Sequence, residues 1–468
     1  MSPLLLSAIA CLSFPSDVET GRLRVPENRS TERPRTLELA FVRLKSTAAE
    51  PGPPLVVLPG GPGNSATALA RSPVWRRFLE IGDVVLMDPR GVGRSEPDLV
   101  WRSEAIRPER FFGDRTTAVA HMAEICRAAA EHYGARGFDL RGYDAIQMAD
   151  DVADLRRALG VERVHLLGHS WGTHVGLAIL RRHPESVARF VSVGTAGTND
   201  ILKLPSDLDA SLRRLSEVVA ADPLVGKGMP DLFATVERVV ARFEKEPLPV
   251  PVSDPRTGEA RSILLGPFGL QLLLVADLGD TSDLPVFPRL LHTLEKRDPS
   301  VVAWFLEKRV RQFSALPVLM LAARGASGAT PGRWNRIRLE AQSSPFGLAR
   351  CLFSPEAEGA LGAGDVGDAF REDVRSEVPA LFVSGALDAH TPPDQAERVR
   401  EGFPNSGHVI VEFGGHEDLL PDPRVQERIL AFLAGAEPVD VRLERPPLRF
   451  APLEGPDPRF DHPALAGR

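Results

Sequence analysis

The chain has 468 residues, of which 43% are hydrophobic and 25% are charged, the composition of a globular protein with room for more than one structural unit. Its formal net charge of -7 provides no basic surface for nucleic acid, and no apolar run reaches the length that a membrane-spanning helix needs. The three cysteines, Cys11, Cys126 and Cys351, are far apart and lack metal-ligand spacing, which favours a reducing compartment over a disulfide framework.

The first ten residues are apolar and end at Cys11, a weak hint of a trimmed signal or a lipid-modified cysteine. The stretch is short and lacks the basic region with which a signal begins. We therefore expect a cytoplasmic protein, with export or lipid anchoring as the alternative if the true N-terminus carries a signal.

The first part of the chain alternates strand-like runs with helical patterns. After two lead-in strands at 22–25 and 37–44, continuous apolar runs occur at Leu55–Leu58, Val84–Met87, Val164–Leu167 and Phe190–Val193. Apolar strands separated by helices indicate a mostly parallel sheet with helices on both faces, the α/β class.

The pattern changes from about residue 199 to residue 373, where helical periodicity dominates and few strand signals occur. Strand-like runs resume at 380–383 and 409–411, and a helix follows. We therefore predict a core of residues 1–198 and 374–436, interrupted by a mostly helical insertion of residues 199–373. The remaining residues, 437–468, form a proline-rich tail that is expected to be extended and packed on the surface, or partly disordered.

The most informative motif is Gly168-His169-Ser170-Trp171-Gly172, which matches G-x-S-x-G between a predicted strand and a predicted helix. This is the pattern of a nucleophile elbow, a turn too sharp for large side chains at the two glycines. It directs Ser170 Oγ into a cleft and leaves the N–H of Trp171 near a helix N-terminus, where negative charge is favoured. The pattern also arises by chance, so its interpretation depends on finding catalytic partners.

A serine nucleophile needs a base, and the base needs a third group that orients it. Asp388 and His416 each follow a predicted late strand, in the chain order Ser, Asp, His of this arrangement. Loops after parallel strands meet at the same edge of the sheet, so we expect the three side chains to converge there. Asp394 is a weaker candidate because it falls inside the next predicted helix.

The other histidines fit the role of the base less well. His390 is expected to line the mouth of the cleft, and His408 to be structural. His165 falls on a buried strand and is interpreted as a core histidine. His169 and His174 flank the serine but are expected to point away from Oγ.

An acyl-transfer site also needs donors for the oxyanion, each worth roughly 10²- to 10³-fold in rate. The Trp171 N–H is one candidate. The other is predicted in the glycine-rich loop at 59–65, where glycine lets the backbone approach the substrate closely.

Together, Gly60-Gly61-Pro62-Gly63, the run Asp88–Ser95 (DPRGVGRS), the elbow and the Asp388/His416 pair resemble the α/β-hydrolases of the proline iminopeptidase and tripeptidyl aminopeptidase branch of serine peptidases. The resemblance covers the core on both sides of the insertion. It implies an α/β-hydrolase fold with a large helical cap after the sixth core strand, and serine-dependent release of N-terminal residues from peptides. It also implies that Ser170 is the nucleophile, His416 the base and Asp388 its orienting acid. The resemblance further implies that Gly60 or Gly61 forms the oxyanion hole together with Trp171.

Two departures concern the substrate. Family members often carry His or Asn where this chain has Pro59. In the tripeptidyl group an acid often lies two residues after a cap cysteine, whereas Cys351 is followed by Leu352 and Phe353, and the nearest acid is Glu356. The residues that would bind a substrate amine are therefore not assigned.

The favoured function is an aminopeptidase acting on short peptides through an acyl-enzyme. The alternative is an esterase or amidase acting on a non-peptide ester, amide or lactone, which uses the same core chemistry. A non-catalytic binding protein on this fold is a third hypothesis, against which the complete set of serine, acid and histidine argues. We expect no metal or organic cofactor and a small-molecule or short-peptide substrate, and leave the oligomeric state open.

Overall fold

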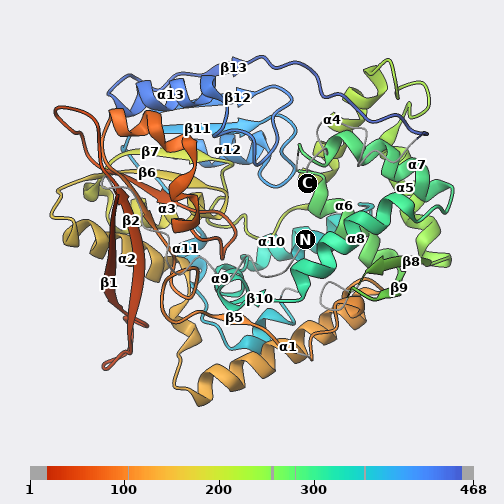
Figure 1. Ribbon diagram of the computed structural model, residues 1–468, viewed down its shortest axis with the longest axis horizontal. Helices are drawn as coiled ribbons and strands as arrows, with labels where there is room; N and C mark the ends of the chain where they lie inside the picture. The colour runs from red at the N-terminus through yellow and green to blue at the C-terminus, as the bar shows by residue number, and fades with distance from the viewer. Residues whose placement is uncertain (1–17, 104, 254–257, 280, 353–354, 456–468) are drawn as a thin grey trace.

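The computed structural model describes residues 18–103, 105–253, 258–279, 281–352 and 355–455, and its centre is a large sheet (Figure 1). The strand order is β1-β2-β4-β3-β6-β7-β11-β12-β13. The strands are β1 (Val18–Pro26), β2 (Thr36–Leu44), β3 (Leu55–Leu58), β4 (Val84–Met87), β6 (Val164–His169), β7 (Val187–Val193), β11 (Ala380–Gly385), β12 (Ser406–Val411) and β13 (Val441–Leu443).

Strands β1, β2 and β4 are joined by antiparallel pairing, and every other neighbour in the sheet pairs in parallel. The short apolar runs predicted from the sequence are parallel strands whose residues are buried on both faces, as in β3 and β4. The prediction of a mostly parallel sheet in an α/β fold is confirmed.

Helices cover both faces of the sheet because successive residues of a strand point to opposite sides. Val56 and Leu58 of β3 share a hydrophobic cluster with α2 (Ala145–Ala158) and α3 (Trp171–Arg182). Leu55 and Val57 belong instead to the cluster that contains α13 (Pro423–Leu433).

The segment between β7 and β11 is mostly helical. It contains α4 (Pro205–Ala221), α5 (Leu232–Lys245), α6 (Pro267–Asp277), α7 (Phe287–Glu295), α8 (Ser300–Phe313), α9 (Val318–Ser327), α10 (Pro331–Glu340) and α11 (Asp368–Arg371). In the view of Figure 1, α4 to α8 lie to the right of the sheet, and α9 and α10 lie below it.

An antiparallel pair of strands in this segment, β8 (Leu248–Ser253) and β9 (Ala260–Leu265), was not predicted. β8 carries Pro249 and Pro251, which usually argue against a strand. Both prolines are exposed and alternate with buried residues. Each strand of a two-stranded sheet is an edge strand, and an edge strand tolerates proline because it does not need every backbone N–H for pairing.

A segment expected in the core belongs structurally with the insertion. β5 (Val100–Trp101) pairs with β10 (Leu316–Pro317), and the N–H of Gly266 donates to the carbonyl of Phe112 at 2.8 Å. The following helix, α1 (Arg115–Ala135), runs below the helices of the insertion (Figure 1). The predicted boundary at residue 198 misplaces this segment, because an amphipathic pattern shows which face is apolar but not which element covers it.

The described part of the tail, residues 437–455, is mostly extended and packs against the rest of the chain. Val441–Leu443 adds β13 in parallel to β12 at the edge of the sheet. The chain then crosses to the insertion, where the N–H of Ala451 donates to the carbonyl of Pro285 at 2.9 Å and Phe450 is 3% exposed. The described tail therefore packs along the chain from the edge of the sheet to α7.

Within the described part of the chain, no helix combines the length and the hydropathy that crossing a bilayer requires. Cys11 and the apolar residues before it lie outside the described residues. Cys126 and Cys351 are buried and are not joined to each other.

The burial of the tail leads to a stability prediction. Phe450→Ala removes a buried aromatic side chain between tail and insertion, so we expect it to lower the free energy of unfolding by about 3 kcal/mol. Val439→Ala removes a side chain that is 48% exposed and should change it by less than about 0.5 kcal/mol. Urea unfolding followed by circular dichroism measures both, and equal midpoints for the two variants would contradict the packed tail.

Candidate active site

Ser170 occupies a strained turn between β6 and α3. Its backbone has φ +53° and ψ −118°, a conformation that residues other than glycine adopt at an energetic cost and mainly at functional sites. A Cβ at Gly172 would lie 1.9 Å from the carbonyl oxygen of Leu58, and one at Gly168 would lie 2.7 Å from the carbonyl oxygen of Gly172. Both glycines are therefore sterically required, as the elbow pattern predicts.

Asp388 and His416 meet at the ends of neighbouring strands β11 and β12. His416 Nδ1 donates to Asp388 Oδ2 at 2.7 Å, and both residues are buried. The other bonds to this carboxylate come from Thr391, through its N–H and hydroxyl, and from the N–H of His390.

Burial alone would raise the pKa of Asp388. The attraction of His416 and the hydrogen bonds from His416 and Thr391 outweigh that effect and hold the pKa well below its ordinary value. The carboxylate therefore stays ionised and keeps the proton of His416 on Nδ1, which leaves Nε2 as the basic nitrogen.

Ser170 and His416 line one cavity of about 500 Å³ between the core and the insertion. Among the described residues, the side-chain hydrogen bonds of His416 run from Nδ1 to Asp388 and Thr391, and none reaches Ser170 Oγ. Catalytic hydrogen bonds are often long in the absence of substrate. The observation that connects Ser170 with His416 is therefore the cavity that both residues line.

The glycine-rich loop after β3 reaches the same cavity. Gly61 lines it beside Ser170 and Trp171, and Trp171 is the first residue of α3, so its N–H has no acceptor within the helix. Gly60 lies behind the elbow, where an added Cβ would be 3.3 Å from Ser170 Cβ. Of the two predicted glycines, Gly61 is therefore better placed to supply an oxyanion donor.

The remaining histidines have separate environments. His390 lines the cavity, with its ring centroid 5.0 Å from that of His416. His408 bonds Glu397 and Ser384. Burial, aided by Arg189, lowers the pKa of His165 to about 4, which suits a neutral core residue.

The two histidines flanking the elbow are also engaged elsewhere. His169 Nε2 donates to the carbonyl of His416 at 3.0 Å, so it supports the loop of the base. His174 is buried between the carbonyl of Gly197 and the hydroxyl of Ser327.

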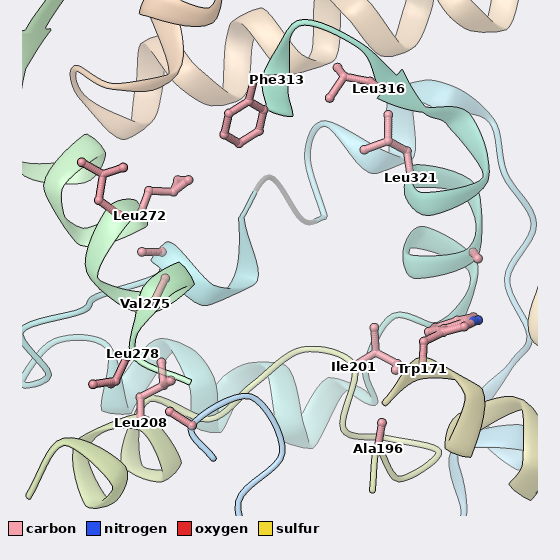
Figure 2. Packing of buried hydrophobic residues seen from close by; sticks show 14 of the residues in the cluster. Trp171, Ala196, Ile201, Leu208, Leu272, Val275, Leu278, Phe313, Leu316 and Leu321 are labelled. Atoms are coloured by element: carbon pink, nitrogen blue, oxygen red, sulfur yellow. The ribbon is translucent and has the colours of Figure 1, made fainter. Parts of the chain in front are cut away.

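The cavity wall combines apolar residues from the core and the insertion. The elbow and the loop after β7 contribute Trp171 and Ile201, and α6, α8 and α9 contribute Leu272, Phe313 and Leu321 (Figure 2).

Charged residues that sequence reasoning did not single out also line it: Lys203, Arg309, Arg324, Arg350, Glu358 and Glu417. No spacing pattern marks them, because they converge from separate elements.

The cysteine region of the insertion contributes no reactive thiol. Burial raises the pKa of the Cys351 thiol to about 11, so the thiolate that a nucleophile requires is disfavoured. Glu356, the acid nearest to Cys351 in the sequence, bonds Arg115 at 3.3 Å and does not line the cavity.

Family models match the two parts of the chain that carry these residues. The alpha/beta hydrolase fold model matches residues 53–255, which include the glycine loop and Ser170. A model described as TAP-like protein matches residues 362–441, which include Asp388 and His416. The chain belongs to the α/β-hydrolase family.

Three of the relatives that the chain matches are peptidases by name. The chain is 28% identical over 201 residues to the serine protease Hip1 of Mycobacterium tuberculosis, covering 40% of this chain and 38% of that protein. It is 28% identical over 195 residues to the tripeptidyl aminopeptidase of Streptomyces coelicolor, covering 38% of this chain and 35% of that protein. It is 24% identical over 230 residues to the proline iminopeptidase of Heyndrickxia coagulans, covering 46% of this chain and 64% of that protein. The chain thus matches less than two fifths of the length of the first two relatives.

The elbow geometry predicts that Ser170 is the residue that an electrophilic probe modifies. A fluorophosphonate should label the wild-type α/β-hydrolase, and Ser170→Ala should abolish labelling because it removes the attacking hydroxyl. Ser343→Ala, which removes an exposed hydroxyl from the insertion, is the matched control and should label normally. In-gel fluorescence measures all three, and persistent labelling of Ser170→Ala would assign the nucleophile elsewhere.

Proposed function

We propose that this chain is a serine hydrolase that releases N-terminal residues from short peptides through an acyl-enzyme. The observation that carries the proposal is the convergence of Ser170, the buried Asp388–His416 pair and the Gly61 loop on one cavity. The names of the relatives support a peptide substrate.

In the proposed mechanism, Ser170 Oγ attacks the scissile carbonyl carbon while His416 Nε2 takes its proton. The negative oxygen that forms is bound by the backbone N–H groups of Gly61 and Trp171. His416 then gives the proton to the leaving amine, and the acyl-enzyme remains. Water, deprotonated by the same imidazole, releases the acid and restores the serine. Asp388 keeps the ring of His416 oriented and stabilises its transient positive charge.

We propose that the insertion, residues 199–373, acts as the cap that selects the substrate. A substrate ammonium in a partly closed cavity needs a carboxylate partner. Two carboxylates line the wall: Glu358, which is 2% exposed, and Glu417, which is exposed. Glu358 is the better candidate because burial strengthens its attraction for a cation.

One observation favours the alternative, an esterase or amidase whose substrate has no free amine. Glu358 already accepts from Arg324 Nε at 3.2 Å, and the position two residues after Cys351 is not acidic. An ammonium would have to compete with this guanidinium for the carboxylate.

We also propose a cytoplasmic location, supported by the two described cysteines, which are buried and free. Fractionation of the producing cells tests it, and recovery of the protein from the medium or the membrane fraction would overturn it.

A substrate panel separates the two activities. We expect alanyl- and prolyl-naphthylamides to be cleaved, and Glu358→Gln to raise KM for them about tenfold or more because a charged hydrogen bond is lost. The same variant should change KM for p-nitrophenyl acetate, which has no amine, by less than twofold. Initial rates across the panel provide the measurement. Hydrolysis of the ester together with no cleavage of any aminoacyl amide would favour the alternative.

The role of Asp388 can be checked on the same substrates. Asp388→Asn preserves the size of the side chain but removes the charge that orients His416, so we expect kcat to fall by about 10⁴-fold. Asp394→Asn, on the helix α12 (Pro393–Arg400), is the control and should retain activity. Equal loss in both variants would indicate disturbance of the loop rather than a role for the carboxylate.

A further inference from the structure

We propose that the cavity contains a subsite for a carboxylate of the substrate, formed by Arg350 and Lys203. The subsite would select short peptides that carry a negative charge on the part that leaves as the amine. This inference rests on the proposed function, which it extends from a reaction type to a substrate class.

The charges on the cavity wall are unbalanced. Four basic side chains line it against two carboxylates. Arg309 is held by Asp277, and Arg324 by Glu358. Among the described residues, neither Arg350 nor Lys203 has a carboxylate within ion-pair distance.

Lys203 is 9% exposed, and the hydrogen bond that its ammonium makes is to the neutral Oε1 of Gln395, at 3.2 Å. An ammonium has three donors, so two remain for a ligand. The carboxylate of Asp200 is bound by Arg333 at 2.8 Å and does not replace such a ligand. A buried cation without an anionic partner is costly, which indicates a group that arrives from outside.

Arg350 has a similar surplus of donors. Its Nη2 donates to Nδ1 of His390, a neutral acceptor, whereas a guanidinium carries five N–H donors in a fork that matches a carboxylate. On the same wall, Arg324 Nη2 is buried and has no hydrogen-bond partner within the part of the chain that the structure describes. Unsatisfied donors of this kind are uncommon and call for an explanation.

The electrostatics are consistent with an anion subsite. Burial, opposed by Asp200 and reinforced by Arg350, lowers the pKa of Lys203 to about 7. Burial and the neighbouring Arg324 lower the pKa of Arg350 to about 10. An anion bound between the two residues would offset both effects.

The position of Arg350 indicates which part of the substrate carries the charge. Arg350 bonds His390, and the ring of His390 lies against that of His416, with 5.0 Å between their centroids. His416 is the group that protonates the leaving amine in the proposed mechanism. A carboxylate at Arg350 therefore belongs to the leaving part, either as the C-terminus of a short peptide or as an acidic side chain near the cleaved bond.

The experiment compares matched peptides of two to five alanines. Each is offered with a free C-terminal carboxylate, as the C-terminal amide, and as an amide in which Asp or Asn replaces one alanine after the first. Products are quantified by mass spectrometry. We expect kcat/KM to be about tenfold or more higher for an anionic form than for its neutral partner. A preference for the free acids identifies the C-terminus, and a preference for Asp over Asn identifies the side chain.

The variants then connect the preference to the subsite. Arg350→Gln and Lys203→Met should each reduce the ratio of anionic to neutral kcat/KM toward one, mainly through KM. Arg311→Gln removes the same charge from an exposed position on α8 and should keep the wild-type ratio. An unchanged ratio in Arg350→Gln, or a wild-type enzyme indifferent to peptide charge, would overturn the subsite.

Calorimetric titration of the same peptides into Ser170→Ala separates failure of the subsite from failure of the proposed function. Tighter binding of the anionic forms, without any cleavage by the wild-type enzyme, would reject the peptidase and keep the subsite. Cleavage of neutral and anionic peptides at equal rates, with equal binding, would keep the peptidase and reject the subsite.

Discussion

The arrangement of the site depends on how His416 is held. Its ring is bonded at Nδ1 by the buried carboxylate of Asp388, with the hydroxyl of Thr391 3.1 Å away. Its carbonyl accepts from His169 of the elbow, and its N–H donates to the carbonyl of Gly279 in the insertion. The ring of the proposed base is thus oriented by Asp388, and its backbone is fixed by the turn that carries Ser170 and by the insertion. A residue held in this way loses little further freedom when its ring accepts a proton, which is the physical basis of preorganisation.

The insertion therefore does more than cover the cavity. It supplies most of the apolar wall and the unpaired cations, and it also contacts the backbone of the base. The tail adds to this connection, because it continues from the edge of the sheet to α7. The proposed catalytic groups and the proposed substrate subsites lie where core and insertion meet. A change in the insertion is therefore expected to alter kcat as well as KM.

Strands and turns were predictable where a few neighbouring residues carried the whole pattern. Leu55–Leu58 and Val84–Met87 are runs that only a doubly buried strand explains, and the sharp turn at Ser170 requires the glycines on either side of it. β8 was missed because its two prolines obscured the alternating pattern. β13 was missed because three residues are too few to show a pattern. The position of α1 was missed because amphipathicity does not specify a partner.

By itself, the sequence was sufficient to predict the catalytic groups. A serine in an elbow, an acid and a histidine after later strands, and a glycine loop are local patterns, and a parallel sheet brings the ends of its strands to one edge. Only the tertiary structure supplied the observations from which a substrate class can be proposed. Lys203 and Arg350 are far apart in the chain and have no shared motif, so their common cavity and their missing counter-ions depend on how the insertion folds over the core. Charge balance in a cavity is a property of three-dimensional proximity, because electrostatic energy depends on distance and burial rather than on position along the chain.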